Sequence, residues 1–155
     1  MDDLQKDILT GDEYNLVQAS SRKRFANYII DLIIFYLLFI VFGIILALLN
    51  PSAVDSLNDN SLGFNLIDRI VSLFLFAIYM GTIEAITKGR SIGKYITGTK
   101  AVNNDGSLIS ISTAFKRGFS RAVPFEPFSA LGSPSLPWHD KWTDTYVIDI
   151  KQSGL

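Results

Sequence analysis

An apolar run of about 25 residues, 25–49, contains a single carboxylate, Asp31. As an α-helix with a rise of 1.5 Å per residue, this run is roughly 38 Å long, which exceeds the ~30 Å hydrocarbon core of a bilayer. A helix of this length that is apolar on all faces is unusual in the core of a soluble protein. The run therefore predicts a membrane span over about residues 25–49.

A second apolar run covers residues 64–87, and its 22 residues from Leu66 to Thr87 are enough to cross a membrane with modest tilt. The loop between the two runs, residues 51–63, has no Lys or Arg. Basic residues instead precede the first run and follow the second, and they are Arg22, Lys23, Arg24, Lys88, Arg90 and Lys94. The positive-inside rule then predicts that both termini are cytoplasmic.

After the second run the pattern changes to shorter elements. Residues 94–111 predict a cytoplasmic β-hairpin, in which a strand at 96–102 leads into the turn sequence 103–106. Residues 111–123 have apolar positions with helical spacing and a basic opposite face, which predicts an amphipathic helix at the inner leaflet. Residues 145–150 predict a strand that can pair with 96–102 in a small sheet.

Residues 124–138 are apolar but contain four prolines, at 124, 127, 134 and 137. The segment is too short and too interrupted to form a regular third span. We expect an interfacial or re-entrant segment, and the alternative is a cover packed on the hairpin. Trp138, Trp142 and Tyr146 suit the membrane interface.

The amino-acid composition and the net charge exclude or disfavour several classes of function. The chain has no cysteine and one histidine, His139, which excludes cysteine-based and multi-histidine metal sites within the chain. A net charge of −1 gives no reason to expect nucleic acid as a partner. No nucleophile, base and orienting group form a recognisable set, so we expect neither an enzyme nor a cofactor. We interpret the His139–Asp140 pair as part of a turn, with His139 at the interface, rather than as a catalytic pair.

Polar residues on the spans are the candidate functional residues. Arg24, Asn27 and Asp31 are spaced i, i+3 and i+7 and share one helix face. A carboxylate at the centre of a span costs roughly 2.5–3.5 kcal/mol, and less toward its ends, so Asp31 needs a partner. Glu84 lies at a comparable depth, and two carboxylates in a low-dielectric layer do not readily both ionise without a nearby cation. Candidates for that cation are Arg24, Lys94, Arg117 and Arg121. The predicted polar cluster comprises Arg24, Asn27, Asp31, Glu84, Arg117, Arg121 and Asp140.

Two interpretations of this cluster compete. In the first, Asp31 and Glu84 pair with arginines of the helix at 111–123 and dock that helix under the spans. In the second, the two carboxylates bind a monovalent cation or a proton and exchange one for the other. Two spans enclose no pathway, so exchange would require homo-oligomers. Gly43/Ala47 and Ala77/Gly81 are pairs of small residues that permit close helix contact, either between copies or within the chain.

Three segments occur in a recognisable order around the two runs: RKRFANYIIDLII at 22–34, GRSIGKYITGTKAVNNDG at 89–106, and WHDKWTDTYVI at 138–148. Together they resemble the RDD family of integral membrane proteins, which is named for one arginine and two aspartates. The resemblance assigns the arginine to Arg24, the first aspartate to Asp31 and the second to Asp140, with Asp144 as the alternative. It implies transport of unknown ligands, and cation/proton antiport has been proposed for some members. Many members have a more regular third span where this chain has its proline-rich segment.

We therefore expect an α-helical membrane protein with two transmembrane helices, an amphipathic or re-entrant helix and a small cytoplasmic β-hairpin or sheet. Residues 1–20 form a cytoplasmic tail and residues 21–150 the membrane domain, in a bacterial inner membrane. The expected function is a component of ion or small-solute transport that uses intramembrane carboxylates. The alternative is a non-transporting anchor or assembly module, whose basic cytoplasmic face binds lipid headgroups or a protein partner. Lys88, Arg90 and Lys116 are candidates for headgroup contact, or simply form the positive flank of the spans.

Overall fold

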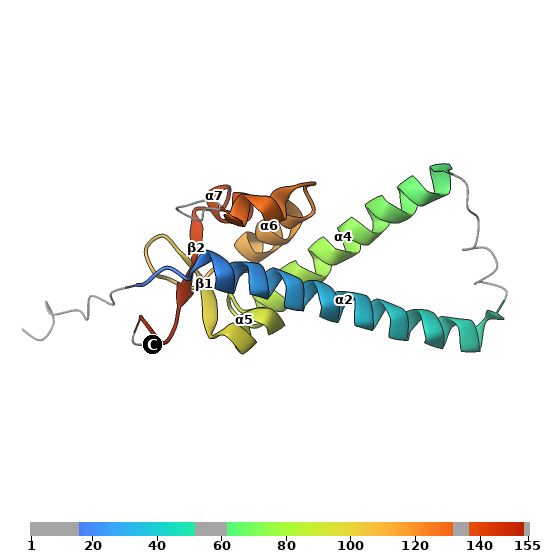
Figure 1. The fold of residues 1–155 in the computed structure, drawn as a ribbon, viewed down its shortest axis with the longest axis horizontal. Helices are drawn as coiled ribbons and strands as arrows, with labels where there is room; N and C mark the ends of the chain where they lie inside the picture. Colours follow the sequence, from blue (N-terminus) through green and yellow to red (C-terminus); the bar gives the residue numbers. More distant parts are fainter. Residues whose placement is uncertain (1–15, 52–61, 132–136, 154–155) are drawn as a thin grey trace, which may run out of the picture.

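The computed structural model describes residues 16–51, 62–131 and 137–153. Most of the expected N-terminal tail and of the loop between the two spans lies outside these residues. Two long helices, α2 (Ser21–Leu49) and α4 (Leu62–Ile86), leave a compact head and splay apart as a V (Figure 1). The head comprises residues 88–131 and 137–153 and the adjoining ends of both helices. Its elements are α5 (Ile92–Thr97), β1 (Thr99–Asn103), α6 (Ile111–Arg121), η1 (Glu126–Leu131), α7 (Trp138–Lys141) and β2 (Thr145–Asp149).

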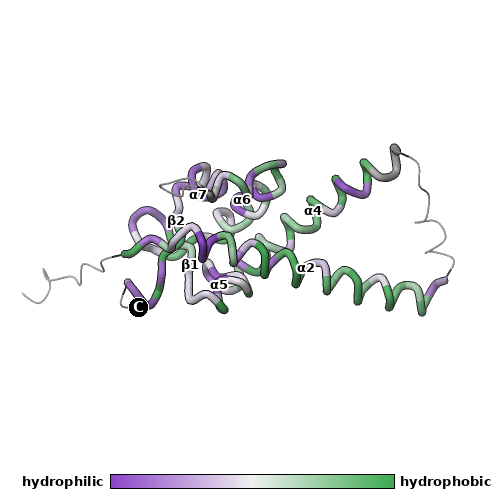
Figure 2. The backbone as a smooth tube through the Cα atoms, in the orientation of Figure 1, coloured by the Kyte–Doolittle hydropathy of each residue, from purple (hydrophilic) through white to green (hydrophobic). Residues whose placement is uncertain are grey.

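Both long helices have the length and apolar composition needed to cross a membrane. Only 6% of the most apolar stretch of α2 is buried, and 22% of that of α4, over Leu66–Ile86. A core helix of a soluble protein would bury most of such a stretch, whereas here hydrophobic residues cover the projecting arms of the V (Figure 2). The prediction of two apolar helices long enough to span a membrane is confirmed.

The arms of the V touch through one aromatic cluster. The rings of Phe35 on α2 and Phe76 on α4 lie 5.2 Å apart in an edge-to-face arrangement, and Met80 packs with them. Beyond this cluster the arms diverge, and large apolar side chains such as Leu48 and Leu66 are exposed. Without a bilayer or a partner, this much exposed apolar surface would be unfavourable in water.

A closer helix contact joins α4 to α6. A Cβ atom at Gly118 would lie 2.4 Å from the Ala77 carbonyl oxygen, and one at Gly81 would lie 2.8 Å from the Phe115 ring. Only glycine permits this approach, and Phe119 adds a ring contact with Phe74 at 5.6 Å. The Ala77/Gly81 pair therefore serves packing within the chain, between the second span and the head.

The sheet has two antiparallel strands, β1 and β2, in a register that pairs Thr99 with Asp149 and Asn103 with Thr145. This pairing confirms the predicted small sheet. The predicted hairpin over 94–111 is wrong. Residues Ile92–Thr97 form helix α5, which Ser91 caps at its start and Gly98, with φ of 68°, ends. The second arm of the expected hairpin makes only the isolated bridge between Val102 and Leu108.

Helix α6 forms as predicted, but its orientation differs from the expected one. Arg117 and Arg121, on its basic face, are 0% and 8% exposed, whereas Ile111 and Phe119 are 68% and 43% exposed. The basic face turns inward because buried carboxylates of other elements pair with it. The orientation expected for an amphipathic helix at the inner leaflet is therefore wrong, and only Lys116 of that face is exposed. The burial of Arg117 and Arg121 agrees instead with their place in the predicted polar cluster.

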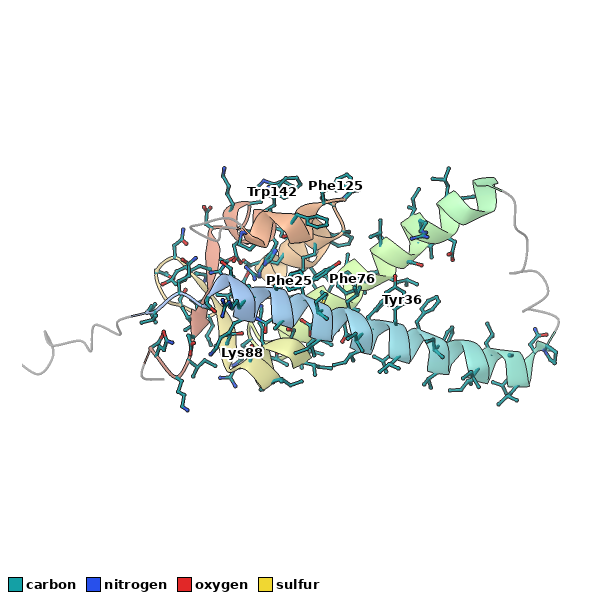
Figure 3. The ribbon with its side chains drawn as sticks, in the orientation of Figure 1. Phe25, Tyr36, Phe76, Lys88, Phe125 and Trp142 are labelled. Atoms are coloured by element: carbon teal, nitrogen blue, oxygen red, sulfur yellow. The ribbon has the colours of Figure 1, made fainter. Side chains whose placement is uncertain are left out.

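Within the proline-rich segment, η1 is a short 3₁₀ helix that contacts α2 and α6. Phe125, just before η1, and Phe128, within it, are exposed, and the rings of Trp138 and Trp142 stack 5.6 Å apart. Figure 3 shows Phe125 and Trp142 on the outer side of the head. Residues 132–136, including Pro134, lie outside the described residues. A position at the membrane interface stays a prediction for this segment.

Candidate functional site

A buried cluster of charged side chains lies where the head meets the bases of α2 and α4. Its members come from the two spans and from α5, α6, α7 and η1, and each is less than 9% exposed. They balance four cations against four carboxylates. We call this the ion-pair cluster, and it consists of Arg24, Lys94, Arg117, Arg121, Asp31, Glu84, Glu126 and Asp140.

Glu84, near the end of α4, is bound by three cations. Its Oε1 lies 2.7 Å from Lys94 Nζ and 2.8 Å from Arg121 Nη1, and its Oε2 accepts a 2.9 Å hydrogen bond from Arg117 Nε. The Arg121 contact is an ion pair without the angle of a hydrogen bond. Burial lowers the pKa of Lys94 to about 8, although Glu84 opposes the shift. Both oxygens of Glu84 are thus engaged from within the chain.

Asp140 on α7 forms the second centre of the cluster. Its Oδ2 lies 2.7 Å from Arg24 Nη1, and its Oδ1 lies 2.6 Å from Arg117 Nη1. Burial alone would raise the pKa of Asp140, but Arg117, with His139 and Arg24, holds it at about 2. Burial also opposes the charge on Arg117, but Glu84 and Asp140 outweigh burial and raise its pKa. Arg117 therefore bridges the carboxylates of α4 and α7.

Arg24 links the base of α2 to more than Asp140. Its Nε donates to the Ala19 carbonyl at 3.1 Å, and its Nη2 donates to the Val147 carbonyl at 3.2 Å. The Arg24 guanidinium thus connects the segment just before α2 with α7 and β2. The positive charge that precedes the first span is used here to hold the head in place.

Asp31 differs from the other carboxylates of the spans. Its Oδ1 accepts a 2.7 Å hydrogen bond from the backbone N–H of Gly93, at the start of α5. A Cβ atom at Gly93 would lie 2.5 Å from the Asn27 carbonyl oxygen, so α5 sits directly against α2. The Asn27 side chain lies between the hydroxyls of Thr97 and Thr99, with 2.9 Å between Asn27 Nδ2 and Thr99 Oγ1.

The predicted pairing of Asp31 with an arginine of α6 needs correction. Among the described residues, no ion pair within 4.0 Å includes Asp31. Gly93 takes the place of the expected arginine because α5, which the sequence did not reveal, lies closer to this face of α2. The other half of that interpretation agrees with the structure, since Arg117 and Arg121 both pair with Glu84.

A cavity of about 30 Å³ lies within the cluster, lined among others by Asp31, Lys94, Arg121, Glu126 and His139. A space of this size and polarity can hold about one water molecule. His139 Nδ1 contacts Glu126 Oε1, and its Nε2 lies 3.4 Å from Arg121 Nη2. Burial, reinforced by Arg121, lowers the pKa of His139, so the neutral Nδ1–H tautomer suits both neighbours.

Sequence reasoning missed part of this site. It placed His139 at the interface, whereas His139 is buried, and it assigned no role to Glu126. The usable signal was Glu126 itself, because a carboxylate within an apolar, proline-rich segment needs a partner. The structure does bring together all seven predicted cluster residues, namely Arg24, Asn27, Asp31, Glu84, Arg117, Arg121 and Asp140.

The predicted headgroup contacts lie outside the ion-pair cluster. Lys88 and Lys116 are exposed, and Arg90 is half-buried, with its guanidinium 5.0 Å from the centre of the Tyr95 ring. Asp144, the alternative to Asp140, is exposed and has φ of 50°. Within the described part of the chain, no three His, Asp or Glu side chains are grouped so that they could hold a metal ion.

The chain was compared with known proteins in three ways. Residues 18–144 match the family model described as the RDD family. Neither the curated proteins nor the solved structures include a match. The matched residues include the whole ion-pair cluster, from Arg24 to Asp140.

Proposed function

The chain belongs to the RDD family, and on that premise we propose that it is a membrane anchor and assembly module whose ion-pair cluster locks the head onto two spans. In this proposal the carboxylates of the cluster hold the fold together and do not carry ions. The charge pattern further supports a bacterial inner membrane protein with both termini in the cytoplasm. The head would then lie on the cytoplasmic side.

The observation that carries this proposal is the occupancy of the carboxylate oxygens. Glu84 and Asp140 each use both oxygens on cations of the same chain, at 2.6–2.9 Å. Removing one partner from a buried ion pair typically costs about 3–5 kcal/mol. An exchange cycle that used Glu84 or Asp140 would have to break such pairs at every turnover, so the arrangement favours a permanent structural role for these two carboxylates.

The arms of the V supply the surface for assembly. Between them lies an open groove of about 220 Å³, lined among others by Phe35, Tyr36, Leu73 and Phe76. Gly43, on the projecting part of α2, has open space where a Cβ would be. With Ala47 it forms a small-residue pair of the kind that lets two membrane helices approach closely. We propose that a second copy of the chain contacts this face of α2.

Cation/proton exchange is the second candidate, and the cavity beside Asp31 supports it. Asp31 has no ion pair among the described residues, its hydrogen bonds are to the Gly93 N–H and the Ser91 side chain, and the cavity also borders Glu126 and His139. These groups can bind protons, and one water could connect them. In this candidate, Asp31 would bind and release the cation or the proton, while the ion pairs of the rest of the cluster stay intact.

One experiment separates the two candidates. The protein is reconstituted into vesicles that contain a pH-sensitive dye, and sodium or potassium gradients are applied to wild type and Asp31→Asn. The anchor proposal expects no cation-dependent pH change above that of empty vesicles. A cation-dependent change in wild type, absent in an equally stable Asp31→Asn variant, would establish exchange and overturn the anchor proposal.

Assembly is tested separately by disulfide crosslinking. The natural chain has no cysteine, so Gly43→Cys introduces a single thiol, and Val41→Cys places one on a different face of the same helix. Assembly through Gly43 predicts oxidised dimers for Gly43→Cys in membranes and few for Val41→Cys. Equal crosslinking of the two variants would indicate random collisions and contradict this interface.

A further inference from the structure

A second, larger groove lies away from the ion-pair cluster, between the start of α2, α5 and the end of β2. It has a volume of about 400 Å³, and Lys23, Arg90, Tyr95, Ile96 and Lys151 line it. In Figure 1, α5 and α6 lie on opposite sides of α2, so this groove is on the side of the head away from α6. The groove contains no residue of the ion-pair cluster and no residue of the proposed assembly surface.

Among the described residues, part of the positive charge of the groove has no paired carboxylate. Lys23 is paired with Asp149, 2.7 Å away, but neither Arg90 nor Lys151 has a carboxylate within 4.0 Å among the residues that the structure describes. Two further cations lie close by. These are Lys88 and Lys100, and burial, together with the charges of Arg90 and Lys88, lowers the pKa of Lys100. Such a grouping attracts an anion.

Apolar side chains adjoin these cations. Tyr95 and Ile96 on α5 are 53% and 66% exposed, and the Arg90 guanidinium lies 5.0 Å from the centre of the Tyr95 ring. The contact of Gly93 with Asn27 holds α5 against the base of the first span. Cations beside exposed aromatic and aliphatic groups at the end of a span match the boundary between lipid headgroups and acyl chains.

We propose that this groove binds the phosphate of an anionic phospholipid, with Arg90 and Lys151 contacting the phosphate and Tyr95 and Ile96 contacting the acyl chains. Lys23 lies at the edge of the site and remains paired with Asp149. A free phosphate would use the cations but would gain nothing from the exposed apolar pair. The site is therefore specific for a lipid, and it is separate from the ion-pair cluster and from the proposed assembly surface.

The test uses the full-length protein in phosphatidylcholine vesicles that contain spin-labelled phosphatidylglycerol or spin-labelled phosphatidylcholine. The fraction of immobilised label gives the preference of the protein for the anionic lipid. The groove variant is Arg90→Gln/Lys151→Gln, and the matched control is Lys116→Gln, which removes an exposed cation on α6. Thermal unfolding checks that all the variants are folded.

We expect the preference for phosphatidylglycerol to fall about fivefold for each groove cation removed, equivalent to about 1 kcal/mol each. Lys116→Gln should keep it. An unchanged preference in the groove variant, or an equal loss in Lys116→Gln, would overturn the proposal in favour of a diffuse positive surface. If millimolar inorganic phosphate displaces the labelled lipid and Tyr95→Ser has no effect, the site binds phosphate alone and the lipid assignment is wrong.

Discussion

Arg24 and Asp140, 116 residues apart in the sequence, form a buried ion pair with 2.7 Å between Nη1 and Oδ2. The pair joins the base of the first span to the short helix before the last strand. The two residues lie near opposite ends of the region that matches the family model. Their ion pair holds the head against the first span. Arg117 contacts the other oxygen of Asp140 and extends the link to α4 through Glu84.

Asp140→Asn should destabilise the protein by about 3–5 kcal/mol, because Arg24 loses its countercharge in a buried site and Arg117 loses one of its two carboxylate partners. The free energy of unfolding, measured in detergent micelles with a chemical denaturant, reports this loss. Asp144→Asn is the control, since Asp144 is exposed, and its effect should stay within about 0.5 kcal/mol. Similar values for the two variants would show that Asp140 is not a centre of the lock.

Gly118→Ala should destabilise the contact between α4 and α6. The new Cβ would lie 2.4 Å from the Ala77 carbonyl oxygen, which forces the helices apart and costs about 1–3 kcal/mol. Ser112→Ala, at an exposed position of the same helix, is the control, and its effect should stay within about 0.5 kcal/mol. Melting temperatures in the same detergent measure both effects. A stable Gly118→Ala variant would contradict the close packing of α6 on the second span.

Stability should fall in acid through Asp140. The pKa of Asp140 is about 2 in the folded protein and 3.8 ordinarily, because Arg117, His139 and Arg24 outweigh the opposing effect of burial. The unfolded chain therefore binds this proton first. The contribution of Asp140 is complete above pH 3.8 and disappears as the pH falls through about 2. Unfolding titrations between pH 2 and pH 6 should show this slope, and Asp140→Asn should reduce it. An identical slope in the variant would assign the acid sensitivity to other groups.

The two tryptophans of the chain, Trp138 and Trp142, should report the position of the head at the membrane. Their rings stack 5.6 Å apart and are partly exposed beside the exposed Phe125 and Phe128. If this face lies in the interface, lipids labelled with a quencher near the headgroup should quench the fluorescence strongly, and aqueous acrylamide should quench it weakly. The reverse pattern would place this face in water.

The parts of the fold that the sequence predicts are those set by local composition. Two apolar runs of span length need no tertiary information, because their length and lack of charge decide the outcome. The same reasoning predicts that Asp31 and Glu84 face the head, since a carboxylate near the end of a span needs a partner. Helix α6 follows from its spacing, and Ser110 caps it as its position indicates.

The parts that the sequence does not predict depend on contacts between distant segments. Residues 92–97 have strand-like composition, but the Ser91 cap, the left-handed Gly98 and the close fit of Gly93 on α2 make them a helix. The inward orientation of the α6 arginines is one of the two interpretations that the sequence left open, and the structure decides it through the pairs of Arg117 and Arg121 with Glu84 and of Arg117 with Asp140. A basic helix face thus does not by itself identify a membrane-facing surface.

The claim that the ion-pair cluster is a structural lock is tested most directly by the pair Glu84 and Lys94, whose charged atoms lie 2.7 Å apart. Glu84→Gln leaves Lys94 and Arg121 without their paired carboxylate and Arg117 with Asp140 alone, and it should destabilise the protein by about 3–5 kcal/mol. Adding Lys94→Met, which removes one cation at similar volume, should restore at least about 1 kcal/mol, since contacting residues couple by about 0.5–3 kcal/mol. The measurement is the free energy of unfolding of wild type, both single variants and the double variant. A double variant more stable than Glu84→Gln is the predicted result, whereas strictly additive losses, or a Glu84→Gln variant as stable as wild type, would contradict the lock.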